Sequence, residues 1–135
     1  MQHRAPHSRS RTIFTAITVV LAGVVASGVV LVAQARRDFD VVARKYNFRV
    51  SGSDAPEIRV TQNDLVHITF STEDIPHSFT IEDPPYRIMR KAEPGKPVSF
   101  DFRADTPGRF RFFCNLTIDE KCKDMQGTLI VERAR

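Results

Sequence analysis

The sequence predicts an all-β sandwich that follows one apolar N-terminal segment. Residues 13–33 form a run of 21 positions without a charged side chain. After this run, short stretches of alternating apolar residues are separated by Gly and Pro turns, and no long helical period is present. Ten Phe and no Trp provide the core of a folded part of about 100 residues, which is enough for one small domain.

The N-terminal third divides into two segments. Residues 1–12 form a basic tail with Arg4, Arg9 and Arg11, and we expect 13–35 to be a transmembrane signal-anchor, because an apolar helix of about 20 residues spans a bilayer. Ala33-Gln34-Ala35 resembles a cleavage site, so a cleaved signal peptide is the alternative. We expect a single-pass protein of the cytoplasmic membrane with domain 36–135 on the extracytoplasmic side.

The folded part alternates with a period of two, as strands do. We expect one strand over 41–50, with Val42, Arg44, Tyr46, Phe48 and Val50 on one face and Arg44 as the exception in an otherwise apolar row. Further strands are expected at 57–60, 65–71, 78–82, 98–102, 110–114 and 127–132, with a short edge strand at 86–90. In the 65–71 strand, Val66, Ile68 and Phe70 point inward, which places His67 on the surface.

Charge and cysteine content exclude several classes of function. Residues 1–35 hold three Arg and no acid, which leaves 17 basic and 16 acidic residues in the remainder. The folded part is therefore nearly neutral, and we expect no nucleic-acid binding. We find no nucleophile–base pair and no paired acids, so an enzyme is not expected. Two cysteines allow one disulfide or one metal site.

Four residues form a candidate metal site: His77, Cys114, Cys122 and Met125. Imidazole, thiolate and thioether are the ligands that proteins use for copper. Cys114 continues the inward row of the 110–114 strand, and seven residues separate it from Cys122. A disulfide between the two cysteines is the alternative, and a switch between disulfide and metal site is a third interpretation. Asp119, in the intervening loop, is interpreted as a solvated carboxylate.

Residues 42–132 resemble the cupredoxin domain of cytochrome c oxidase subunit II and of nitrous oxide reductase. The likeness is carried by five motifs, which are Asp74-Ile75-Pro76-His77-Ser78-Phe79, Ala92-Glu93-Pro94-Gly95-Lys96, Thr106-Pro107-Gly108-Arg109-Phe110, Cys114, and Met125-Gln126-Gly127-Thr128-Leu129-Ile130-Val131. The resemblance implies a cupredoxin-like Greek-key β-sandwich and a role in electron transport.

Two departures from that family change the expected chemistry. Its dinuclear copper (CuA) loop has the order Cys, three residues, Cys, three residues, His, two residues, Met. On this chain the second Cys falls on Ile118, and the His falls on Cys122. A dinuclear centre is therefore not expected. The resemblance implies one copper, held by His77, Cys114, Cys122 and Met125.

Three functions follow from this interpretation. The first is electron transfer in a respiratory chain, with a cytochrome or an oxidase subunit as redox partner and the protein as an accessory component of a terminal oxidase. The second is a copper holding or delivery protein for oxidase assembly, which the two thiolates favour. The third is a metal-free interaction module stapled by a disulfide.

Overall fold

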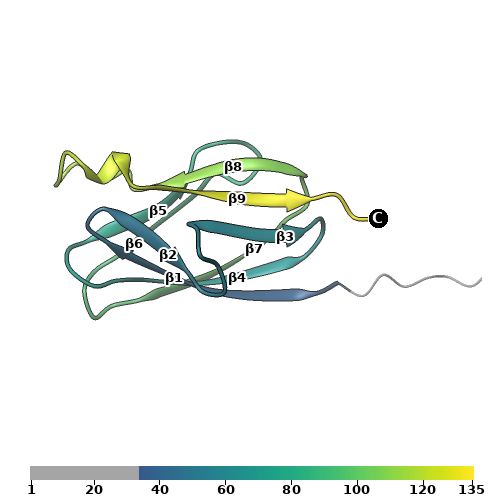
Figure 1. The fold of residues 1–135 in the computed structure, drawn as a ribbon, viewed down its shortest axis with the longest axis horizontal. Coiled ribbons are helices and arrows are strands. Elements are labelled where there is room, and N and C mark those ends of the chain that lie inside the picture. The colour runs from purple at the N-terminus through teal and green to yellow at the C-terminus, as the bar shows by residue number, and fades with distance from the viewer. Residues whose placement is uncertain (1–33) are drawn as a thin grey trace, which may run out of the picture. The chain divides into compact units, whose positions relative to one another are not determined.

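The computed structural model describes residues 34–135, which form a sandwich of two β-sheets (Figure 1). This part of the chain contains nine strands and one short 3-10 helix. In chain order they are β1 (Arg36–Arg44), β2 (Asn47–Val50), β3 (Glu57–Thr61), β4 (Leu65–Thr72), β5 (His77–Ile81), β6 (Ile88–Ala92), β7 (Val98–Arg103), β8 (Gly108–Phe113), η1 (Cys122–Asp124) and β9 (Gln126–Glu132).

One sheet has the strand order β2-β1-β4-β7, and the other has the order β3-β9-β8-β5-β6. Two strand pairs are parallel, β1 with β4 and β3 with β9, and they bring together strands that no hairpin could connect. The β1–β4 pair runs over eight register positions. By contrast, β5 and β8 share a single register pair, Thr80 with Phe113. This short ladder lies beside the candidate site.

The core is built from phenylalanine rings between the two sheets. Phe79 stacks on Phe112 with a distance of 4.7 Å between the ring centroids and also packs against Phe70 and Phe100. Phe70, Phe79 and Phe112 are fully buried. Truncating a buried Phe to Ala typically costs about 3–5 kcal/mol, so these rings account for much of the stability of the sandwich.

Gly127 is required where β9 packs closely against the core ring of Phe112. A Cβ atom at this position would overlap the ring of Phe112 and the backbone carbonyl of Pro56. The backbone of β9 therefore approaches β8 closely, two residues after Met125. A side chain here would displace the strand that follows the candidate site.

The prediction of an all-β sandwich is confirmed, and so is the inward row of Val66, Ile68 and Phe70. The prediction of a single strand over 41–50 is wrong. The chain turns at Lys45 and Tyr46, so β1 and β2 form a hairpin.

The turn also reverses which residues of the first strand face inward. Val41 and Ala43 are fully buried, opposite Val50 and Phe48 of β2. Val42 faces outward, and Tyr46 lies in the turn itself. The β1 strand starts at Arg36 because it pairs with β4 from Arg36 to Ala43. The expected edge strand exists as β6, shifted toward Ala92 by its pairing with β5.

The expected basic tail and the transmembrane signal-anchor lie outside the described residues. Within residues 34–135, no helix has the length and apolar character needed to cross a membrane.

Candidate metal centre

His77 opens β5, the strand on which the site depends. Pro76 precedes it, and all five residues of β5 are buried. His77 and Phe79 lie on the same face of the strand because side chains alternate with a period of two. The imidazole is therefore held among core side chains at one end of the sandwich and has no exposed surface.

Asp74 determines how the His77 ring is presented. Its Oδ1 atom lies 2.9 Å from His77 Nε2. Burial by itself would raise the pKa of Asp74. The backbone N–H groups of Lys45 and Ile75 and the ring of His77 outweigh that effect and lower its pKa to about 2.

An ionised carboxylate can only accept a hydrogen bond, so the Nε2 atom of His77 carries the proton. In the neutral ring, Nδ1 then keeps its lone pair free for a ligand. This is the usual arrangement of a metal-binding histidine, in which a carboxylate holds the ring nitrogen that does not bind the metal.

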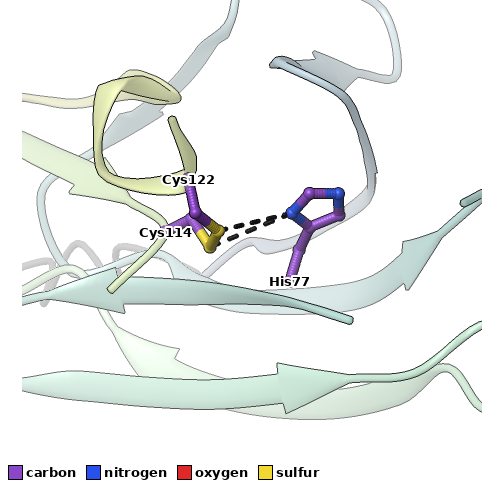
Figure 2. A group of neighbouring side chains, drawn as sticks. All are labelled: His77, Cys114 and Cys122. Carbon is purple, nitrogen blue, oxygen red and sulfur yellow. Dashed lines mark hydrogen bonds between the residues drawn. A yellow bond between two sulfur atoms is a disulfide. The ribbon is translucent and has the colours of Figure 1, made fainter. Parts of the chain in front are cut away.

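The Nδ1 atom of His77 faces both cysteines (Figure 2). It lies 3.5 Å from Cys122 Sγ and 3.9 Å from Cys114 Sγ. Cys114 directly follows β8, and Cys122 begins η1, where its N–H donates to the backbone carbonyl of Asp119. All three side chains are fully buried, and their donor atoms lie within 4.8 Å of one another.

The two cysteines form a disulfide, with their Cα atoms 5.2 Å apart. In this state the sulfurs are bonded to each other. A metal would take both of them as thiolates only after reduction. The chemistry of the group fits copper in the dithiol form, since one imidazole and two thiolates are soft donors.

Ser78 and Asn115 connect the strand of the histidine to the strand of the cysteine. The backbone N–H of Ser78 donates to Cys114 Sγ at 3.5 Å. The Ser78 hydroxyl donates to Asn115 Oδ1 and accepts the Asn115 backbone N–H, at 2.7 and 2.8 Å. The backbones of β5 and β8 share only one register pair, Thr80 with Phe113. The bonds of Ser78 with Asn115 lie next to this pair and connect β5 to the residues that follow β8.

The other two positions of the predicted loop differ in environment. Met125 is fully buried, and its backbone carbonyl accepts a hydrogen bond from the Cys114 N–H at 3.3 Å. Its backbone therefore lies beside that of Cys114. Ile118 is 63% exposed and is not part of the buried group. A thiol would be needed at this position to bridge two metals, and the position is turned toward solvent.

Sequence reasoning missed three supporting residues. Asp74 was part of the motif around His77, and its spacing of three residues from the histidine was the signal available. Ser78 and Asn115 each follow a candidate ligand directly, but no sequence pattern indicated that they contact each other. Only the fold, which brings β5 beside the loop that follows β8, reveals this contact.

Known structures with this fold include chains of a terminal oxidase and of a cytochrome oxidase. A chain of a heme-copper terminal oxidase dimer is 25% identical, with a TM-score of 0.63 over 76% of this chain and 68% of that chain. The periplasmic domain of subunit II of cytochrome oxidase from Bradyrhizobium japonicum is 16% identical, with a TM-score of 0.63 over 76% and 88%. The blue copper protein auracyanin A from Chloroflexus aurantiacus is 17% identical, with a TM-score of 0.56 over 73% and 100%.

Among curated proteins, no match was found. A family model described as a cupredoxin-like domain matches residues 14–131, which is most of the chain. The resemblance of the sequence to the copper domain of oxidase subunit II is supported by this match and by the structures above. The chain belongs to the cupredoxin-like domain family.

Proposed function

We propose that this protein is a membrane-anchored cupredoxin that transfers electrons through one copper ion in a respiratory chain. The observation that carries the proposal is the buried group at the end of β5, where His77 Nδ1 faces the sulfurs of Cys114 and Cys122. The likeness to subunit II of oxidases supports a redox partner of that class, such as a cytochrome or an oxidase subunit.

The proposed ligands are His77, Cys114, Cys122 and Met125. Copper supplies a one-electron couple when bound, and the protein residues set its surroundings. Asp74 holds the His77 ring so that Nδ1 faces the sulfurs. After reduction, the backbone N–H of Ser78 would stabilise the negative charge of the Cys114 thiolate. Full burial of the group excludes water from it.

The disulfide adds a requirement before copper can bind. Reduction by a dithiol transfers two electrons and two protons to the cysteine pair, and the dithiol becomes a disulfide. Disulfides persist in oxidising compartments, which supports our placement of the domain on the extracytoplasmic side of the cytoplasmic membrane. The uncharged run of 13–33 is the proposed anchor.

Copper titration of the reduced full-length protein tests this function. After dithiothreitol is removed anaerobically, we expect about one Cu(I) per chain. Cys122→Ser should weaken binding by about tenfold or more, because a neutral hydroxyl is a poor ligand for a soft ion. Ile118→Ser is the matched control, since it alters the same loop at an exposed position and should bind like the wild type.

Two results would contradict the proposal. Two tightly bound coppers per chain would indicate a dinuclear centre. Failure of the reduced, folded protein to bind copper would favour a metal-free module stapled by the disulfide.

A second candidate function is copper holding or delivery for oxidase assembly. It is favoured by the presence of two cysteines in one candidate site, because thiolate ligands select Cu(I). Reversible cycling of the bound copper between Cu(I) and Cu(II) would support electron transfer. Transfer of Cu(I) to a recipient without such cycling would support delivery.

A further inference from the structure

The turn between β1 and β2 contacts two aspartates that support the candidate metal centre, one beside His77 and one in the loop between the two cysteines. The backbone N–H of Lys45 donates to Asp74 Oδ2 at 2.7 Å, and the other oxygen of Asp74 holds the His77 ring. The next residue, Tyr46, donates its hydroxyl to Asp119 Oδ2 at 3.0 Å. Two consecutive residues thus bind the carboxylates on either side of the site.

Asp119 also supports the cysteine loop, which is the segment of residues 115–121 between Cys114 and Cys122. Its Oδ1 atom accepts the Lys121 backbone N–H at 2.9 Å, and its backbone carbonyl accepts the Cys122 N–H at 3.1 Å. The Tyr46 hydroxyl is therefore connected through one residue to the turn that presents Cys122. On the other side, Lys45 is connected through Asp74 to His77.

The two connections begin with exposed hydrogen bonds but differ in what lies behind them. His77 is fully buried beside Asp74, whereas Tyr46 is 40% exposed and its ring lies 5.3 Å from the Lys121 ammonium group. Water can replace the bond between Tyr46 and Asp119 at small cost, because exposed hydrogen bonds contribute little net free energy. The Tyr46 bond is also the longer of the two, at 3.0 Å against 2.7 Å for the Lys45 bond.

The site itself is closed to solvent. Cys114, Cys122 and His77 have no exposed surface, so a reductant reaches the disulfide only after local opening. The cysteine loop is tied at both ends by the disulfide. The β1–β2 turn is joined to it through the side chain of Tyr46.

We propose that the Lys45–Tyr46 turn keeps the candidate metal centre closed to solvent. When Tyr46 releases Asp119, thiols can reach the Cys114–Cys122 disulfide. The inference rests on the proposed function only in treating His77 and the two cysteines as one site. During reduction by dithiothreitol, one thiolate attacks a sulfur of the disulfide. The second thiol then closes the cyclic disulfide of the reagent and leaves two cysteine thiols on the chain.

The test is the rate at which dithiothreitol reduces the disulfide in the folded full-length protein in detergent, followed by timed alkylation of the new thiols. Tyr46→Phe removes only the hydroxyl. We expect the rate to rise by about 3- to 10-fold, the change in an opening equilibrium that the loss of one exposed hydrogen bond produces. Asp119→Asn leaves one acceptor oxygen where the carboxylate serves both the Tyr46 hydroxyl and the Lys121 N–H, so it should also raise the rate.

Tyr86→Phe is the matched control. It removes the other tyrosine hydroxyl of the chain, which bonds to Thr106 and not to the site. Its rate should equal that of the wild type. Equal rates for Tyr46→Phe and wild type would contradict the proposal that this turn keeps the site closed. Equal acceleration in Tyr46→Phe and Tyr86→Phe would also overturn it, because general loss of stability would then explain the effect. The assay needs no copper, so failure of copper binding leaves its outcome distinct.

Discussion

Two histidines on consecutive strands, β4 and β5, each pair with an aspartate at nearly the same distance. His67 Nδ1 is 2.8 Å from Asp101 Oδ1, and His77 Nε2 is 2.9 Å from Asp74 Oδ1. The side chains of the first pair are 24% and 51% exposed, and those of the second are 0% and 26% exposed. The same two residue types are therefore placed in opposite surroundings.

The comparison shows that the surroundings of a pair, more than its hydrogen bond, decide what it can do. Water competes for both members of the exposed pair. The interaction energy between His67 and Asp101 is therefore small and is screened by salt. In the buried pair, Asp74 also accepts two backbone N–H groups, and the free nitrogen of His77 faces two sulfurs. Only the second pair can orient a ligand toward a closed site.

The largest expected difference between the pairs is in copper binding. We predict that His77→Ala lowers the Cu(I) affinity of the reduced protein by about 100-fold or more, since even residues that only support a ligand contribute about 10- to 100-fold. His67→Ala should leave the affinity within about twofold. Competition with a chromophoric Cu(I) chelator measures both values. If the two variants lost affinity equally, the buried pair would have no special role in the site.

The next difference concerns stability and its dependence on pH. The pKa of Asp74 is lowered from 3.8 to about 2, so its carboxylate stabilises the folded state above pH 3.8, and this contribution is lost as pH falls through 2. We predict that Asp74→Asn lowers the free energy of unfolding by about 1–2 kcal/mol at pH 7.

Urea unfolding at pH 7 and pH 3 tests this prediction. The difference in free energy of unfolding between wild type and Asp74→Asn should have its full size above about pH 5. It should shrink by pH 3, because protonation then begins to remove the stabilisation that the Asp74 carboxylate gives the folded state. A gap of the same size at both pH values would mean that the charge of Asp74 does not stabilise the fold. The same experiment with Asp101→Asn should show almost no gap at either pH.

The sequence predicted β4 better than β5, and the reason is physical. One face of β4 meets the core and the other meets solvent, so its apolar residues alternate, and both the inward row and the outward His67 follow from the pattern. All five residues of β5 are buried. Ser78 and Thr80 are buried although they are polar, and Asn115 from a distant loop supplies the partner for Ser78. Alternation cannot reveal such a contact.

Other features were also beyond a local pattern. Val42, Tyr46 and Val50 have the spacing of one strand, and the turn at Lys45 that changes the phase has no Gly or Pro to mark it. The four candidate ligands remain a prediction as a metal site. The spacing of the cysteines is compatible with a disulfide as well as with a metal, and the choice depends on the redox state of the protein rather than on the residues alone.

The smallest expected effect belongs to the exposed pair itself. We predict that Asp101→Asn changes the free energy of unfolding by less than about 0.5 kcal/mol at pH 7, and that raising NaCl from about 0.05 to 1 M removes what remains. Both side chains reach solvent, so water competes for this interaction. Urea unfolding of the full-length protein at the two salt concentrations measures the effect. A loss above about 1 kcal/mol that persists in high salt would mean that this face of the sheet is covered in the assembled protein. The two pairs would then belong to one class, and the contrast between them would fail.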